Sequence, residues 1–108
     1  MPHDPHLADL MRQTIGNRQG VREIKMFGGI CWVLNGNMIA GVSESRYMFR
    51  VGKDRQEEAL ERPGTSPMDF TGRLMRGIVW VDADEAIDAG LDNWIAYAEE
   101  FVGGLPPK

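Results

Sequence analysis

The sequence predicts an α+β domain, in which an antiparallel meander sheet of about five strands carries an N-terminal and a C-terminal helix packed on it. Three observations predict this class. Both ends of the chain repeat apolar residues at helical spacing, short apolar segments fill the region between residues 21 and 51, and Asn35-Gly36 separates two of those segments. Asn-Gly between apolar runs indicates a tight hairpin, because both central residues of that turn need positive φ. The flanking segments are therefore expected to pair antiparallel.

The first helix is expected to begin at Asp4-Pro5, because aspartate is a good N-cap and proline is tolerated at the first helical position. One buried face follows at spacings of three and four residues, formed by Leu7, Leu10, Met11 and Ile15. Gly16-Asn17 and Gly20 then end the helix.

Four strands are expected after this helix, with ranges Val21–Phe27, Gly29–Leu34, Asn37–Ser43 and Arg46–Val51. Glu44-Ser45 forms the tight connection between the last two. In the fourth strand, aromatic and aliphatic residues alternate with arginines and a methionine, which is the period-two pattern of a strand.

The second half of the chain is expected to hold one more long strand and the final helix. Lys53–Glu61 is typical of a short charged helix, Arg62–Pro67 of a loop, Met68–Phe70 of a brief extended piece, and Arg73–Val81 of the last strand. A buried stripe predicts the final helix through Ile87, Leu91, Trp94, Ile95, Ala98 and Phe101 or Val102. Gly90 interrupts this pattern, so the continuous helix is expected to begin near Asp88.

Residues 1–108 are expected to form one domain, which is a common size for a single hydrophobic core. The sequence has no membrane-spanning apolar run and no leader pattern, and Cys31 is its only cysteine, so we expect a cytoplasmic protein without disulfides. The net charge is −4, and no lysine or arginine occurs from Asp82 to Glu100. Direct nucleic-acid binding is therefore disfavoured, because such proteins concentrate basic charge on one face.

The predicted strands are apolar on both faces. In the strand before the Asn-Gly turn, Ile30, Trp32 and Leu34 point one way, while Cys31 and Val33 point the other. Two helices can cover one face of a five-stranded sheet but hardly both. We therefore expect an open second face, completed by a homodimer contact or by a protein partner.

The residue pattern predicts no catalytic residue, metal or cofactor. His3 and His6 are the only histidines and lie near the N-terminus, so neither Cys31 nor a serine has an evident base beside it. Cys31 is expected to be a buried strand residue rather than a reactive thiol. A metal site at His3, Asp4 and His6 is disfavoured, because short terminal tracts are usually disordered.

Two further motifs have ordinary structural interpretations. Asp88 and Asp92 are four residues apart and fit a solvated acidic helix face better than an acid–base pair. Gly28-Gly29 fits a tight bend or bulge better than a phosphate cradle, because an anion site would use a helix N-terminus after the glycines.

A basic group lies on and after the fourth strand. Arg46 and Arg50 share one strand face, and Lys53 and Arg55 follow closely. This group can bind an anion or an acidic partner, or it can consist of ordinary solvated charges balanced by neighbouring carboxylates.

The segments Lys25-Met26-Phe27-Gly28-Gly29, Asn35-Gly36-Asn37-Met38 and Pro67–Gly77 together resemble the N-terminal domain of the TfoX/Sxy family. Trp94 and the closing residues 105–108 extend the resemblance to nearly the whole chain. It implies an α+β fold with helices on an antiparallel sheet. It also implies a stand-alone domain, since full-length members carry a C-terminal helical domain for which this chain leaves no room.

Full-length members of that family regulate natural competence and act with a DNA-binding transcription activator as coactivators. The resemblance therefore implies a non-enzymatic protein-interaction or regulatory module, and it implies no catalytic residue. The candidate interaction surface comprises Met26, Phe27, Gly28, Gly29, Arg46, Arg50, Asp69 and Arg73. The alternative is a small-ligand-binding protein or a small enzyme that uses a cleft beside Gly28-Gly29.

Overall fold

A computed structural model describes residues 4–16, 18–26, 29–70 and 73–107. It contains a six-stranded antiparallel sheet in the order β1-β2-β3-β4-β6-β5. The strands are β1 (Val21–Met26), β2 (Gly29–Leu34), β3 (Asn37–Ser43), β4 (Arg46–Arg50), β5 (Thr65–Phe70) and β6 (Arg73–Asp82). The helices are α1 (Pro5–Ile15), η1 (Lys53–Arg55, a 3-10 helix), α2 (Gln56–Leu60), α3 (Ala83–Ala89) and α4 (Leu91–Val102). The predicted α+β class is confirmed, with one strand more than expected.

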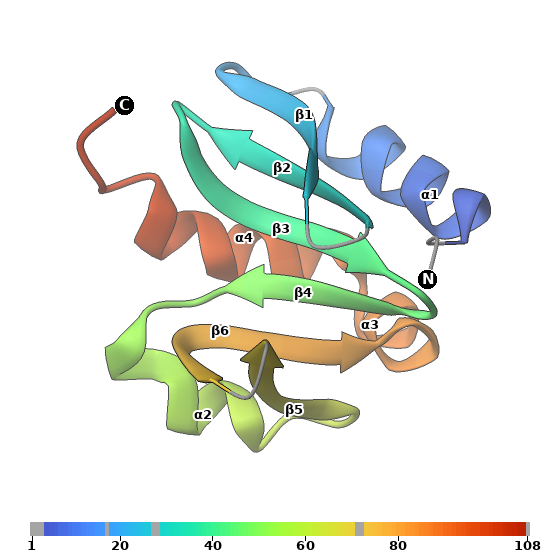
Figure 1. Ribbon diagram of the computed structural model, residues 1–108, viewed down its shortest axis with the longest axis vertical. Helices are drawn as coiled ribbons and strands as arrows, with labels where there is room; N and C mark the ends of the chain where they lie inside the picture. Colours follow the sequence, from blue (N-terminus) through green and yellow to red (C-terminus); the bar gives the residue numbers. More distant parts are fainter. Residues whose placement is uncertain (1–3, 17, 27–28, 71–72, 108) are drawn as a thin grey trace.

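The main core lies between the sheet and the helices. Figure 1 shows α1, α3 and α4 behind the sheet, on one of its two sides. Phe49 of β4 stacks on Trp94 of α4 with ring centroids 5.2 Å apart. The Tyr47 hydroxyl donates a hydrogen bond of 2.7 Å to the carbonyl oxygen of Leu7 in α1. These contacts fix both terminal helices to the central strands.

Helix α1 begins at the predicted capping residue and buries the predicted apolar face. The side chain of Asp4 accepts a hydrogen bond from the backbone N–H of His6 at 2.9 Å, and Pro5 occupies the first turn. The helix buries Leu7, Ala8, Met11 and Ile15 against the main core, with Leu10 half-buried beside them. The predicted buried face is confirmed.

Both tight turns of the meander are confirmed. Asn35 and Gly36 have φ of 53° and 86°, the pair of positive values that an Asn-Gly hairpin requires. Glu44 also has positive φ, 56°, at the turn with Ser45. The turn chemistry therefore sets the order β2-β3-β4.

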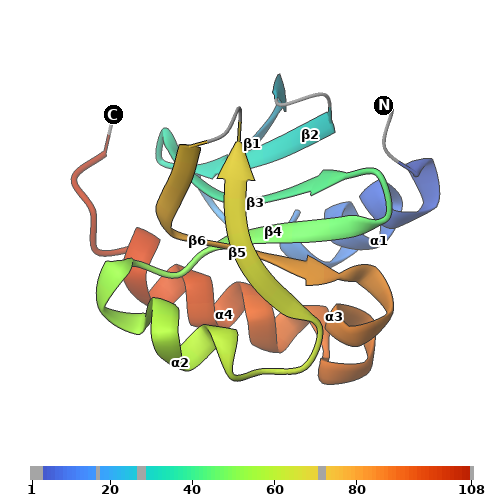
Figure 2. The same ribbon diagram turned by 60° about the horizontal axis from the view of Figure 1, so that its bottom comes forward.

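A glycine pair brings β6 close to the backbone that follows β4. Gly77 of β6 has φ of 86° and Gly52 has φ of 91°. The carbonyl oxygen of Gly77 accepts hydrogen bonds from the N–H groups of Val51 and Gly52, at 2.8 and 3.1 Å. A Cβ on Gly77 would lie 3.2 Å from the backbone of Gly52, so these two backbone segments pass each other at close range. In Figure 2, β5 rises from the level of α2 and α3 past β6 and β4.

The prediction for residues 62–70 was wrong in one respect. Thr65–Phe70 forms a full strand, whereas a loop through Pro67 and only a brief extended piece had been expected. Strand β5 lies at the sheet edge and its register shifts between Pro67 and Asp69. Proline is tolerated in both settings, because neither needs every backbone N–H in the ladder.

The expectation of an open apolar face is contradicted for the residues whose side chains the structure describes. The second face carries a separate buried cluster of Cys31, Met48, Met68, Ile78 and Trp80, each at most 7% exposed. Part of its cover is intramolecular: Met68 comes from the β5–β6 hairpin, and the Arg46 guanidinium lies 4.0 Å from the Trp80 ring centroid. The strand alternation was predicted correctly, but the conclusion that this face needs a partner does not follow.

The C-terminal helix is divided at Gly90, whose φ of 96° no helical residue adopts. Ile87, expected on the buried stripe, lies on α3 and is 41% exposed. Asp88 and Asp92 consequently lie on different helices rather than one turn apart on a single helix. Helix α4 buries Leu91, Trp94, Ile95, Tyr97, Ala98 and Val102. Within the described ranges, no helix is long and apolar enough to cross a membrane.

Candidate functional site

The eight residues of the predicted interaction surface are distributed over several elements. Phe27 and Gly28 lie outside the described residues. Met26, Asp69 and Arg73 take part in the backbone pairing that closes the β1–β2 and β5–β6 hairpins. Among the eight residues, the structure describes the side chains of Arg46 and Arg50, and Gly29 has none.

Gly29 has a packing role at the start of β2. A Cβ at this position would overlap the carbonyl oxygen of Val42 in β3 and would lie 3.2 Å from the Cα of Ser43. Backbone atoms cannot rotate away, so only a residue without a side chain lets the two strands approach this closely. The requirement is steric, and it accounts for this glycine without a ligand.

Arg46 and Arg50 do not converge on one site. They lie at the two ends of β4, and Met48 between them is buried in the second-face cluster. Arg46 covers Trp80, whereas the Arg50 guanidinium lies 5.6 Å from the ring centroid of Phe101 in α4. Each arginine thus has an aromatic neighbour of its own.

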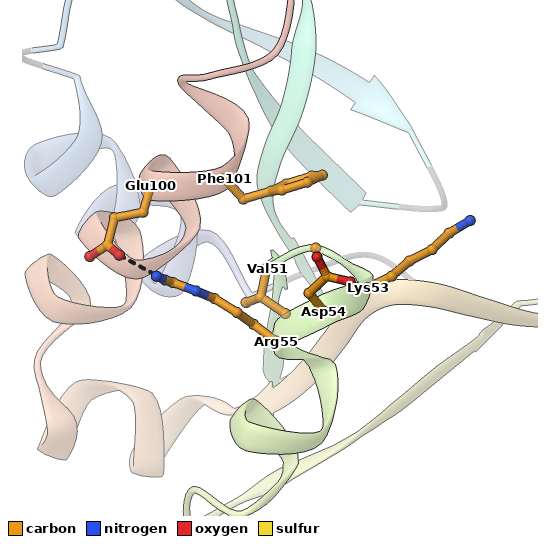
Figure 3. A pocket seen from close by; sticks show the side chains of 7 residues that line it. Val51, Lys53, Asp54, Arg55, Glu100 and Phe101 are labelled. Carbon is orange, nitrogen blue, oxygen red and sulfur yellow. Dashed lines mark ion pairs between the residues drawn. The ribbon is translucent and has the colours of Figure 1, made fainter.

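A groove of about 420 Å³ lies beside Phe101, between η1 and the end of α4. Its lining is Val51, Gly52, Lys53, Asp54, Arg55, Glu100 and Phe101. Figure 3 shows the Arg55 guanidinium directed at Glu100, an ion pair of 2.7 Å, and Lys53 extending away from them. The lining residues combine an aromatic wall with charges of both signs, which is typical of a pocket that binds a small ligand.

Sequence reasoning missed this groove. At this groove Gly52 lies against Phe101, and a Cβ on Gly52 would lie 2.7 Å from the Phe101 ring. Gly52 lies between the expected strand Arg46–Val51 and the expected helix Lys53–Glu61, and nothing local connects it to a residue near the end of the chain.

Two arginines of the α2 region also cover aromatic rings of α4. The Arg62 guanidinium lies 4.0 Å from the Tyr97 ring centroid and 5.0 Å from that of Trp94, and Arg55 lies 5.0 Å from Tyr97. The Tyr97 hydroxyl is buried without a hydrogen-bond partner among the described residues. Burial and the charge of Glu58 raise the pKa of Tyr97, against the lowering effect of Arg62 and Arg55. The arginines thereby hold α2 on α4.

Cys31 is a buried strand residue, as predicted. It is fully shielded, and burial raises the pKa of its thiol to about 11. Gly41 on the neighbouring strand leaves room for it, since a Cβ there would overlap the Met48 methyl group and lie 3.2 Å from the Cys31 sulfur. The thiol is therefore neutral at physiological pH and packs as a small apolar group.

The Cys31 thiol should make the protein less stable in alkali. Its pKa in the folded state, about 11, exceeds the ordinary value of 9.0, so ionisation favours the unfolded chain. The contribution is complete below pH 9 and is lost as pH rises towards 11, by about 2–3 kcal/mol in all. Urea unfolding at a series of pH values, compared with Cys31→Ala, measures it. Parallel pH dependences for the two proteins would contradict the assignment.

The carboxylates of the C-terminal region divide into two groups. Glu99 pairs with Arg18 at 3.2 Å, and Glu100 pairs with Arg55. In contrast, Asp82, Asp84, Asp88 and Asp92 are exposed and make no ion pair with any residue in the described ranges. Asp82 and Asp84 also line a groove of about 430 Å³ with Asp4. Across the described part of the chain, no His, Cys, Asp and Glu side chains are placed to hold a metal ion.

These features define a small α+β domain with an open antiparallel sheet and helices on one side. The TfoX N-terminal domain family matches residues 13–102, from within α1 to the end of α4. The chain belongs to this family. Comparison with curated proteins and with solved structures finds no match.

Proposed function

We propose that the chain is a non-enzymatic protein-interaction module of the cytoplasm that acts in transcription regulation. The observation that carries the proposal is membership of the TfoX N-terminal domain family over residues 13–102. Full-length proteins that this chain resembles act as coactivators with a DNA-binding transcription activator, and such a role depends on contacts between proteins.

The charge of the α3–α4 region supports a protein partner over nucleic acid. Asp82, Asp84, Asp88 and Asp92 expose unpaired carboxylates on α3, the residue before it and the start of α4. Such a surface repels phosphates and is complementary to a basic protein surface. We call these four residues the acidic surface.

Photo-crosslinking in the source cells tests the proposal. A crosslinker at Ala89 is expected to capture a specific protein, and the double change Asp84→Lys/Asp88→Lys is expected to lower the yield about tenfold or more. The control Glu57→Lys/Glu61→Lys changes the net charge equally on exposed positions of α2 and its C-cap, and it should leave capture unchanged. Equal capture by all three proteins would contradict a role for the acidic surface.

The groove beside Phe101 favours a second candidate, a small-ligand-binding protein, at a different place from the one predicted near Gly28-Gly29. A metabolite screen by thermal shift distinguishes the two, because a ligand at one hundred times its dissociation constant stabilises by about 2.7 kcal/mol. A stabilising metabolite whose effect Phe101→Ala removes, together with no captured protein, would favour the ligand-binding function.

A further inference from the structure

Strand β1 is the edge of the sheet opposite β5, and its outer side is the feature that the proposed function leaves unused. Among the residues that the structure describes, β1 pairs only with β2. The N–H of Asn35 donates to the carbonyl oxygen of Gly20 at 2.9 Å, and this pair continues the register in which Val21 pairs with Leu34. Because hydrogen-bonded pairs alternate in an antiparallel ladder, residues 22 and 24 direct their peptide groups at β2. Val21, Glu23 and Lys25 therefore direct theirs outward.

We propose that two copies of the chain pair antiparallel through β1, with Ile24 facing Ile24 of the second copy. Two edge strands can bond only through residues whose peptide groups point outward. In this register, Glu23 of each copy therefore forms a hydrogen-bonded pair with Lys25 of the other copy. The six-stranded sheets of both copies then join edge to edge, with their helices on the same side. The occupant is a second copy of this chain, which goes beyond the proposed partner of the acidic surface.

Charge selects this register over its neighbour. A two-fold axis between the facing Ile24 residues relates the two copies. Moving this axis by one residue, to Glu23, would set two glutamates directly opposite, and like charges facing across strands are destabilising. With the axis at Ile24, each glutamate faces a lysine. The Glu23 carboxylate keeps its contacts to Arg12 of α1, at 2.6 and 2.8 Å, and accepts the incoming lysine in addition.

The two faces of β1 fit the same register. Val21 packs on the main core and Ile24 packs on the second-face cluster, so odd-numbered residues of β1 face the helices and even-numbered residues face away. Ile24 is only half-buried, and a facing Ile24 would cover it at the close, non-hydrogen-bonded distance of an antiparallel pair. Charges on edge strands normally prevent pairing between sheets. Here the charges oppose a register centred on Glu23 or on Lys25, which would pair like charges, and they are complementary in the register centred on Ile24.

Sedimentation of the whole chain across a concentration series tests the proposal. We expect a reversible dimer at tens of micromolar, and Lys25→Glu should raise its dissociation constant about tenfold or more, because glutamates then face glutamates. Arg22→Glu is the matched control: it changes the charge equally on an exposed residue of the same strand, but residue 22 lies on the other face and opposite an uncharged position. It should leave the dissociation constant within about threefold.

An equal mixture of the Glu23→Lys and Lys25→Glu variants tests the register directly. Each variant alone places like charges opposite one another, whereas the mixture places opposite charges at both pairs, so dimer formation should return only on mixing. A monomer at every concentration, or a dimer that Lys25→Glu leaves intact, would overturn the proposal. Far-UV circular dichroism of each variant shows that the fold is kept. If the monomeric variants still capture the partner of the acidic surface, the proposed function stands whether or not self-pairing occurs.

Discussion

Replacing Trp94 with alanine is expected to lower the free energy of unfolding by about 3–5 kcal/mol, the largest effect of any single change considered. Trp94 is 1% exposed and stacks on Phe49, with ring centroids 5.2 Å apart and planes 15° from parallel. Its other contacts are an edge contact to Tyr97 at 6.0 Å and the Arg62 guanidinium at 5.0 Å. Truncation of Trp94 therefore removes the contact of α4 with Phe49 of β4 and its contact with Arg62 after α2.

Urea unfolding followed by far-UV circular dichroism measures this loss without depending on tryptophan fluorescence. Trp94→Phe should restore part of the stability, because a smaller ring keeps some of the stacking on Phe49. Ile87→Ala is the control, since Ile87 is 41% exposed and its truncation should cost less than about 1 kcal/mol. A Trp94→Ala protein within about 1 kcal/mol of the wild type would show that α4 is not held by this contact.

The parts of the fold that depend on local chemistry could be predicted from the sequence. Asn35-Gly36 requires positive φ at both positions and has it, and Asp4 caps α1. Alternation along β2 correctly separated Trp32 in the main core from Cys31 in the second-face cluster. In each case the deciding interaction lies within a few residues, so the pattern contains all the information that is needed.

The closure of the second face could not be predicted, because it depends on contacts between distant residues. Gly77 approaches the backbone of Gly52 closely, whereas the sequence pattern placed Gly77 inside a continuous strand and Gly52 after the end of another. Without that close approach, Met68 was assigned to a brief extended piece instead of the second-face cluster. The second face of the sheet was therefore expected to be open.

The candidate site was predicted less well for the same reason. Arg46 and Arg50 were correctly placed on one face of β4, but the rings that they cover come from β6 and α4. Arg55 was grouped with these arginines, as a site for an anion or acidic partner or as a charge balanced by neighbouring carboxylates, and its carboxylate partner is the distant Glu100. Partners more than thirty residues away decide whether an arginine is available to a ligand, and composition does not identify them.

The role of Gly29 is the remaining question about the predicted surface, and replacing Gly29 with alanine separates structure from recognition. The added Cβ would overlap the backbone carbonyl of Val42, which cannot rotate aside, so β2 and β3 must separate locally. The expected loss is about 3 kcal/mol of unfolding free energy, at the upper end for an overpacked site. Gly104→Ala is the matched control, because its Cβ would lie 3.6 Å from the nearest atom, an ordinary contact, and it should cost less than about 1 kcal/mol.

Urea unfolding gives the stability of both alanine variants, and crosslinked yield at Ala89 gives their partner capture. If Gly29 serves packing alone, capture by Gly29→Ala falls only with the fraction of chains that are unfolded, and it recovers at a temperature where the variant is fully folded. A variant as stable as the wild type that no longer captures the partner would instead assign Gly29 to recognition. Because the crowded atom belongs to the backbone of β3, we expect the first result.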